Sequence, residues 1–61
     1  LGVKVFGGQK IQPGQIILKQ VGSKFKPSTG TKLARDFTIF AVKEGVVKFR
    51  KLRGQRLVAV V

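Results

Sequence analysis

Residues 46–61 read VVKFRKLRGQRLVAVV, and the pattern in this stretch decides the fold. In its first half, Val47 and Phe49 alternate with Lys48 and Arg50. Because successive side chains of a strand point to opposite faces, the two apolar residues share one face and the two cations share the other. One face packs and the other is wet and basic, which is typical of an antiparallel sheet.

Glycines mark tight turns on either side of this strand. Gly45 precedes it, and Gly54 follows it within the turn 53–55. A tight hairpin needs a positive φ, which glycine adopts without a steric penalty. We therefore expect a meander of three antiparallel strands over residues 37–42, 46–52 and 56–61.

The N-terminal half is cut into short segments by its glycines and prolines. Residues 3–6 form a short strand that ends at a Gly-Gly pair, and residues 12–15 (Gln-Pro-Gly-Gln) form a turn. Residues 16–20 form a strand whose unbroken Ile-Ile-Leu run predicts burial on both faces. Residues 21–36 are expected to be mostly irregular, with one short strand at 23–26.

The fold class follows from these segments. No stretch long enough for a helix carries apolar side chains at helical spacing without a Gly or Pro. Val, Ile, Phe and Thr dominate between the turns, and these residues suit a pleated, half-buried surface. We predict a single all-β domain over residues 1–61: a small antiparallel barrel or sandwich of five or six short strands, without internal repeats.

The charge balance is strongly basic. Thirteen Lys and Arg residues oppose only Asp36 and Glu44, which gives a formal net charge of +11. Like charges repel in a compact chain, and a polyanion removes that penalty while releasing counterions. The alternative, a merely solvated surface, needs a net charge of only about 2–8. Because the cations are spread along strands and loops, they indicate a folded body that touches phosphates on several sides.

The chain has no cysteine and no histidine. Disulfides are thereby excluded, and few ligands remain for zinc or iron. A domain near this size buries only about 60% of the surface of its unfolded chain, so a binding partner is the remaining source of stability. The lack of cysteine also fits a reducing compartment.

The same composition argues against catalysis. His, Cys and Tyr are absent, and only two carboxylates are present to act as acids or bases. The serines and threonines have no imidazole to activate them, and neither common glycine-rich phosphate-binding motif occurs. We expect no enzyme activity and no cofactor.

Membrane roles are not indicated either. No segment approaches the roughly 18 apolar residues of a membrane span, and the start Leu1-Gly2-Val3-Lys4 has no apolar signal-peptide region. A cationic membrane-active peptide would need an amphipathic helix or a disulfide framework. The sequence starts without Met, so we expect further N-terminal residues to precede Leu1 in the protein.

Residues 24–26 (Lys-Phe-Lys) are the sharpest candidate for an RNA contact. Either Phe25 stacks on an unpaired base between two phosphate-binding cations, or it fills the core beneath a long loop. Asp36 either fixes the guanidinium of a neighbouring arginine or accepts backbone N–H groups in an Asx turn. The Gly7-Gly8 pair either lets an RNA backbone approach closely or forms an ordinary sharp turn.

The other phenylalanines are Phe6, Phe37, Phe40 and Phe49, and they are most simply core residues. If two of them shared one solvent-facing surface instead, that surface would resemble a platform for single-stranded nucleic acid.

Four segments read LGVKVFGG (1–8), IILKQ with GSKFKP (16–27), RDFTIFA (35–41) and EGVVKF (44–49). In this order and at this spacing, they resemble the folded domain of the bacterial-type large-subunit ribosomal protein L27 family. Each segment is weak alone, but the four in register cover nearly the whole chain and make a strong match.

The resemblance implies a compact β domain docked on large-subunit ribosomal RNA, near the transfer RNA ends and the peptidyl-transferase centre. It also implies a basic N-terminal tail, absent from this sequence, that reaches toward that centre. The implied partners are large-subunit ribosomal RNA, neighbouring ribosomal proteins and, through the tail, transfer RNA. The implied location is the ribosome in the cytoplasm, with an organellar ribosome as the alternative.

The sequence departs from the family pattern at three positions. Val21 stands where the family usually has a basic residue, and Ala34 and Phe37 stand where it usually has Gly and His. A phosphate contact at position 21 and a base contact at position 37 are therefore not expected. Carried over residue by residue, the resemblance implies RNA contacts at Lys4, Gly7, Gly8, Lys19, Gln20, Lys24, Phe25, Lys26, Lys32 and Arg35.

These observations predict a structural constituent of the large ribosomal subunit that binds ribosomal RNA by phosphate contacts and shape recognition. The alternative is a free-standing barrel module that binds single-stranded nucleic acid and displays an exposed aromatic pair on one sheet face.

Overall fold

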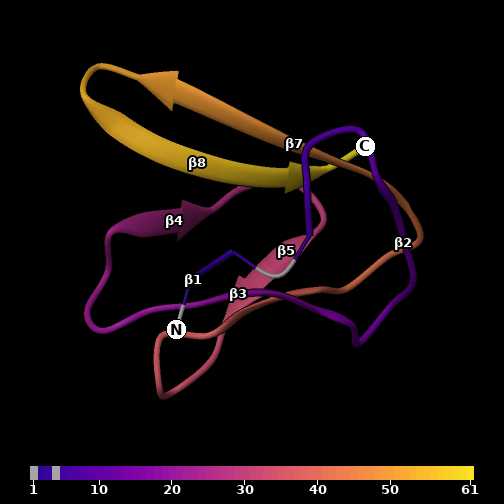
Figure 1. Cartoon of the computed structure of the whole chain (residues 1–61), viewed down its shortest axis with the longest axis horizontal. Helices are drawn as coiled ribbons and strands as arrows, with labels where there is room; N and C mark the ends of the chain where they lie inside the picture. Colours follow the sequence, from indigo (N-terminus) through magenta and orange to yellow (C-terminus); the bar gives the residue numbers. More distant parts are fainter. Residues whose placement is uncertain (1, 4) are drawn as a thin grey trace.

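The computed structural model of the chain describes residues 2–3 and 5–61 and consists of two four-stranded sheets (Figure 1). The first sheet is antiparallel, in the order β1 (Gly2–Val3), β3 (Ile16–Lys19), β6 (Ile39–Ala41), β5 (Thr31–Leu33). The second sheet has the order β2 (Lys10–Ile11), β7 (Gly45–Leu52), β8 (Gln55–Val60), β4 (Phe25–Pro27).

The predicted all-β class is confirmed, with eight strands in the described part of the chain rather than five or six. The β7–β8 pair is antiparallel as expected, the β2–β7 pair is also antiparallel, and β4 runs parallel to β8. The described residues include no helix with the length and apolar character needed to cross a bilayer.

A single apolar core lies between the two sheets. Its fully buried side chains come from the inner faces of both sheets. They are Ile11, Ile17, Leu18, Ile39, Val47, Val58 and Val60. Burial of these side chains is the main favourable term for folding in a chain without covalent cross-links.

The hairpin of β7 and β8 is the longest feature of the fold (Figure 1). Leu52 pairs with Gln55, so the loop has two residues, Arg53 and Gly54. Both have a positive φ, 52° at Arg53 and 78° at Gly54. Two consecutive positive φ angles match the twist of the flanking strands. The prediction of a tight hairpin at Gly54 is confirmed.

The expected C-terminal meander is wrong, because β6 lies in the first sheet and β7 in the second. Gly45 does not have a positive φ, so the predicted tight turn there is wrong as well. Its lack of a side chain serves another purpose: a Cβ at Gly45 would lie 2.6 Å from the carbonyl oxygen of Val61. Gly45 lets the start of β7 pass close to the C-terminal end of β8.

Gly30 has the same role where the chain passes from β4 to β5 and so changes sheets. A Cβ at Gly30 would lie 2.5 Å from the carbonyl oxygen of Val60, and the φ of Gly30 is 75°. The neighbouring Thr31 is buried, and its hydroxyl donates to the carbonyl oxygen of Val58 at 3.0 Å. These contacts join the two sheets at one end of the β7–β8 hairpin.

The apolar run in β3 is not buried on both faces. Ile16 is 39% exposed, whereas Ile17 and Leu18 are both buried. A register shift between Ile16 and Leu18 in the pairing with β6 lets two successive side chains reach the core. A strict two-residue period would have placed only one of them there.

Three short strands were not predicted with their observed bounds. The two-residue β2 was missed, and the region expected to be irregular contains both β4 and β5. The strand expected at residues 3–6 overlaps β1 (Gly2–Val3) only at Val3; Val5 and Phe6 are not in a strand, and Lys4 lies outside the described residues. Such short strands carry too few residues to show a period of their own and depend on pairing with distant partners.

Candidate nucleic-acid interface

The basic residues that the structure describes are all on the surface. The structure describes twelve of the thirteen Lys and Arg residues, all except Lys4, and each of the twelve is exposed. Lys4 is a predicted RNA contact that lies outside the described residues. Burial of a lone cation is costly, so this placement is expected, and the informative question is how the cations are grouped.

Strand register groups four cations on the outward side of the second sheet, here called the outer basic face. In β7, Lys48 and Arg50 are exposed, whereas Val47 is buried and Phe49 half-buried, as the alternation predicted. Lys10 of β2 pairs with Val46, which points to the same side of β7 as Lys48 and Arg50. The outer basic face therefore comprises Lys10, Lys26, Lys48 and Arg50.

The pairing across three strands fixes the spacing of these charges. Lys26 and Arg50 are both in register with Leu57 of β8, so the three residues form one row across the sheet. Adjacent strands lie about 4.8 Å apart, which puts the Cα atoms of Lys26 and Arg50 about 10 Å apart. Leu57 is half-buried between these two side chains, whose aliphatic stems can cover it.

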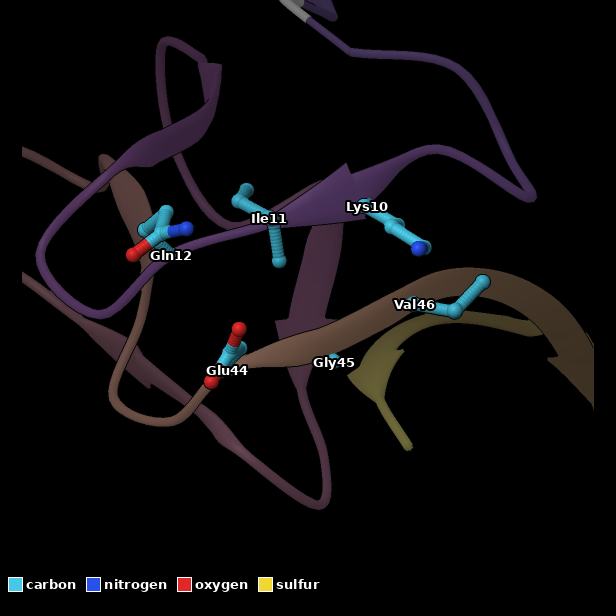
Figure 2. A pocket seen from close by; sticks show the side chains of 6 residues that line it. All are labelled: Lys10, Ile11, Gln12, Glu44, Gly45 and Val46. Carbon is cyan, nitrogen blue, oxygen red and sulfur yellow. The ribbon is translucent and has the colours of Figure 1, made fainter.

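A small depression lies between β2 and the start of β7, next to the outer basic face (Figure 2). It has a volume of about 210 Å³, and its lining includes Lys10, Gln12 and Glu44. Figure 2 shows the Lys10 side chain directed away from the Glu44 carboxylate. With one of the two acidic residues of the chain in its wall, this depression is a poor phosphate site.

Three of the predicted RNA contacts belong to the first sheet instead. Lys19 ends β3, Lys32 lies in the middle of the edge strand β5, and Arg35 is in the turn that follows β5. All three are exposed. The structure does not bring them onto the outer basic face, so any RNA contact they make is on another side of the body.

Asp36 forms the Asx turn that was one of its two predicted roles. Its Oδ1 accepts the backbone N–H of Thr38 at 3.2 Å. Hydrogen bonds from Thr38 lower the pKa of the Asp36 carboxyl below 3.8, with a smaller contribution from the charge of Lys19. Asp36 therefore stays ionised near neutral pH and orders the turn that carries Arg35.

Gln20 and Phe25 form a clamp at the start of β4. The Gln20 side chain is buried; its Oε1 accepts the N–H of Phe25 at 2.8 Å, and its Nε2 donates to the Phe25 carbonyl at 3.1 Å. These bonds give Gln20 a structural role, and its predicted RNA contact stays a prediction. The clamp fixes Phe25 between the exposed residues Lys24 and Lys26.

Phe25 has features of both roles predicted for it. It packs against the apolar core, with its ring 5.9 Å from that of Phe49 in an edge-to-face arrangement. It also remains half-exposed, and the guanidinium of Arg56 lies 5.8 Å from the centre of its ring.

The Gly7-Gly8 pair lies in a sharp turn against β7. Gly8 has a φ of 87°, which favours glycine, and its N–H donates to the carbonyl of Val47 at 2.8 Å. A Cβ at Gly8 would meet nothing within 4 Å, so the backbone there is also open to a ligand. The turn role is confirmed, and close approach of RNA at Gly7 and Gly8 stays a prediction.

The prediction that four phenylalanines are core residues is wrong for three of them: of the four, Phe49 packs against the core, whereas Phe40 pairs with the exposed residues Ile16 and Lys32 on the outward side of the first sheet. Phe6 is 82% exposed and Phe37 is 39% exposed, whereas Phe40 and Phe49 are half-buried. Phe37 adopts a φ of 67° in the turn before β6, which turns it away from a regular strand position. Phe6 follows β1 and lies in the turn that Gly7 and Gly8 form.

The predicted contact set left out seven of the thirteen cations, among them Lys10, Lys48 and Arg50 of the outer basic face. Alternation within residues 46–50 had already put Lys48 and Arg50 on the wet face. The pairing of β2 with β7 and of β4 with β8 then adds Lys10 and Lys26 to that face. Among the described residues, no group of His, Cys, Asp and Glu side chains could hold a metal ion.

Comparison with known proteins identifies the family of this chain. The sequence matches the family described as "Ribosomal L27 protein" over residues 1–60. It is similar to the "Large ribosomal subunit protein bL27" of Bdellovibrio bacteriovorus, with 50% identity over 56 residues. That alignment covers 92% of this chain and 65% of the relative, so the chain spans about two thirds of the relative's length. The chain belongs to the ribosomal L27 protein family.

Proposed function

We propose that the protein is a structural constituent of the large ribosomal subunit and binds ribosomal RNA through its folded body. The observation that supports this most is the outer basic face, where four cations occupy fixed strand positions. Neither acidic side chain of the chain belongs to that face: Asp36 is in the turn before β6, and Glu44, just before β7, lines the depression beside the face. The family and the name of the relative support the same proposal.

The proposed mechanism is electrostatic docking with recognition of RNA shape. Each phosphate that a cation neutralises releases counterions, and this supplies most of the affinity. The deep groove of A-form RNA is closed to side chains, so phosphates, 2′-hydroxyls and unpaired bases are the available contacts. Cations held by strands keep a fixed spacing and thereby favour one arrangement of phosphates over others. No catalytic step is part of the proposal.

The finer location is carried by the family resemblance. On that ground we propose that the domain lies near the transfer RNA ends and the peptidyl-transferase region, beside neighbouring ribosomal proteins, and that a basic N-terminal tail contacts transfer RNA. Lys19 and Lys32 of the first sheet and Arg35 in the turn after β5, all carried over from the family, are further cations away from the outer basic face. RNA that touches these cations as well as the outer basic face would embed the body, as the spread of charge along the chain predicted.

Two matched triple variants test the proposal. One is Lys26→Gln with Lys48→Gln and Arg50→Gln on the outer basic face; the other is Lys19→Gln with Lys32→Gln and Arg35→Gln. Both remove three charges from exposed positions. Binding to large-subunit ribosomal RNA is measured over a salt series. We expect the first triple to flatten the slope of log affinity against log salt by roughly 2–3, at about 0.7–0.9 per phosphate contact.

The second triple is expected to flatten the slope by less, because its cations are not aligned in one sheet face. Duplex DNA and unstructured RNA of equal mass serve as comparison ligands. If both triples had the same effect on all three nucleic acids, the protein would be a generic polycation and the proposal would be wrong.

A second candidate function is a free-standing module for single-stranded nucleic acid. The exposed Phe6 near the half-exposed Phe25 and Phe49 favours it. This candidate predicts that unstructured RNA binds at least as tightly as ribosomal RNA in the same series.

A further inference from the structure

An open depression between β4, β7 and the turn after β1 has a volume of about 360 Å³. It is lined by Val5, Phe6, Gly7, Phe25 and Phe49. Pockets that hold small organic ligands have volumes of roughly 300–1,000 Å³, so the depression is large enough for a nucleobase. Three aromatic rings in the wall of one depression are notable in a chain that contains five phenylalanines.

The turn that carries Phe6 is fixed to the body, so Phe6 is exposed at a defined place. The Phe6 N–H donates to Oε1 of Gln9, and the Gln9 N–H donates to the Phe6 carbonyl, each at 3.2 Å. Gly8 N–H and the Gln9 carbonyl both bond to Val47 of β7. A single exposed apolar residue needs no explanation, but one held by its backbone at the rim of an apolar depression does.

Gly7 keeps the depression open. A Cβ at Gly7 would lie 3.5 Å from the ring of Phe49, an ordinary contact, and Gly7 does not have a positive φ. A side chain could therefore be added there without backbone strain, and a large one would cover the Phe49 ring. The glycine leaves that ring accessible from outside.

Two cations follow the aromatic residues on the same side of the hairpin. Along this side, Val47 pairs with Val60, Phe49 with Val58, and Lys51 with Arg56. The Arg56 guanidinium lies over the Phe25 ring. Like charges directly opposite each other in a sheet destabilise it, and an anion between them would remove the repulsion.

We propose that this depression is a subsite for one unpaired RNA nucleotide, with the base against Phe6, Phe25 and Phe49 and a phosphate against Lys51 and Arg56. A nucleotide joins an aromatic face to a phosphate within a few ångströms, and this subsite offers a partner for each. An apolar side chain from a neighbouring protein would fill the depression but leave the two cations unpaired. The inference rests on the proposed function, because it takes RNA as the partner.

The test measures binding of the full chain to protein-free large-subunit ribosomal RNA. Phe6→Ala removes one stacking surface and should weaken binding about 5-fold or more, with an unchanged salt slope. Phe6→Trp should restore it. Gly7→Leu should weaken binding by filling the depression, and Arg56→Gln should flatten the salt slope by roughly 0.7–0.9. Thermal unfolding of each variant checks that the fold is intact.

Phe37→Ala is the matched control, since Phe37 is a partly exposed aromatic residue that does not line the depression. It should bind like the unmodified protein. If Phe6→Ala and Gly7→Leu lost no more affinity than Phe37→Ala, the nucleotide subsite would be disproved. The same result is expected if a side chain of a neighbouring protein, and not RNA, fills the depression. The triple variant of the outer basic face tests RNA binding separately from the nucleotide subsite, because its effect on binding does not depend on Phe6. RNA binding can therefore be confirmed even where the subsite is disproved.

Discussion

The two ends of the β7–β8 hairpin are built from the same two strands but meet different surroundings. At one end Val47 and Val60 are fully buried, and Gly30 and Gly45 pass close to the end of β8. At the other end the same side of the hairpin carries Lys51 opposite Arg56, both exposed. The buried end stabilises the fold, and the exposed basic end is where we propose that an RNA phosphate binds.

The largest effect is expected at the buried end. Gly30→Ala should destabilise the protein by about 3 kcal/mol or more, because it adds a clash with the Val60 carbonyl to the usual cost of a positive φ. Gly54→Ala at the other end is the matched control. Gly54 has a similar φ but open space around it, so about 1–2 kcal/mol is expected. Chemical denaturation compares the two.

If Gly54→Ala lowered the free energy of unfolding as much as Gly30→Ala, the close approach of Gly30 to Val60 would add nothing to the cost of a positive φ. The comparison of the two ends would then fail, because the loop would be as tightly constrained as the core.

A stabilising effect is expected at the loop. Arg53 has a φ of 52°, a conformation that asparagine tolerates better than arginine. Arg53→Asn should therefore stabilise the protein by about 0.5–1 kcal/mol, which raises the melting temperature by a few degrees in a domain of this size. Arg35→Asn, at an exposed turn position without a positive φ, serves as the control and should give no such rise.

The smallest effect concerns the pair of cations. Lys51→Glu replaces a repulsive cross-strand pair by an attractive one and should stabilise the protein by roughly 0.2–1 kcal/mol at low salt. Salt should remove most of the gain, because both side chains are exposed. Lys48→Glu is the matched control, since Lys48 pairs with Ala59. A gain of equal size in the control would mean that general charge reduction, and not the pair, is responsible.

The sequence predicted which way side chains point within a strand but not which strands pair. Val47, Lys48 and Arg50 lie as alternation required, and Gly54 has the φ that a tight hairpin needs. β6 and β7 lie in different sheets, and this arrangement brings Gly30 against Val60 and Gly45 against Val61. Both partners are at the end of the chain, distant in sequence from Gly30. A glycine that permits close approach looks, in a sequence, the same as one that permits a turn.

The candidate site shows the same division. Residues 24–26 were singled out from composition, and the structure keeps Lys24 and Lys26 exposed on either side of Phe25. Lys10 joins the outer basic face only through the pairing of β2 with β7. β2 has two residues and is too short to show a period of its own in the sequence. The exposure of Phe6 could not be read from residue type, because phenylalanine is usually buried.

The short β4 strand has a consequence for the protein before it meets its partner. β4 is an edge of the second sheet, and it ends at Pro27, which has no N–H to offer to another strand. Lys24 and Lys26 add charge along the same edge. A second copy of the chain therefore finds no continuous row of donors and acceptors there, and free molecules should resist stacking into fibrils while they wait for assembly.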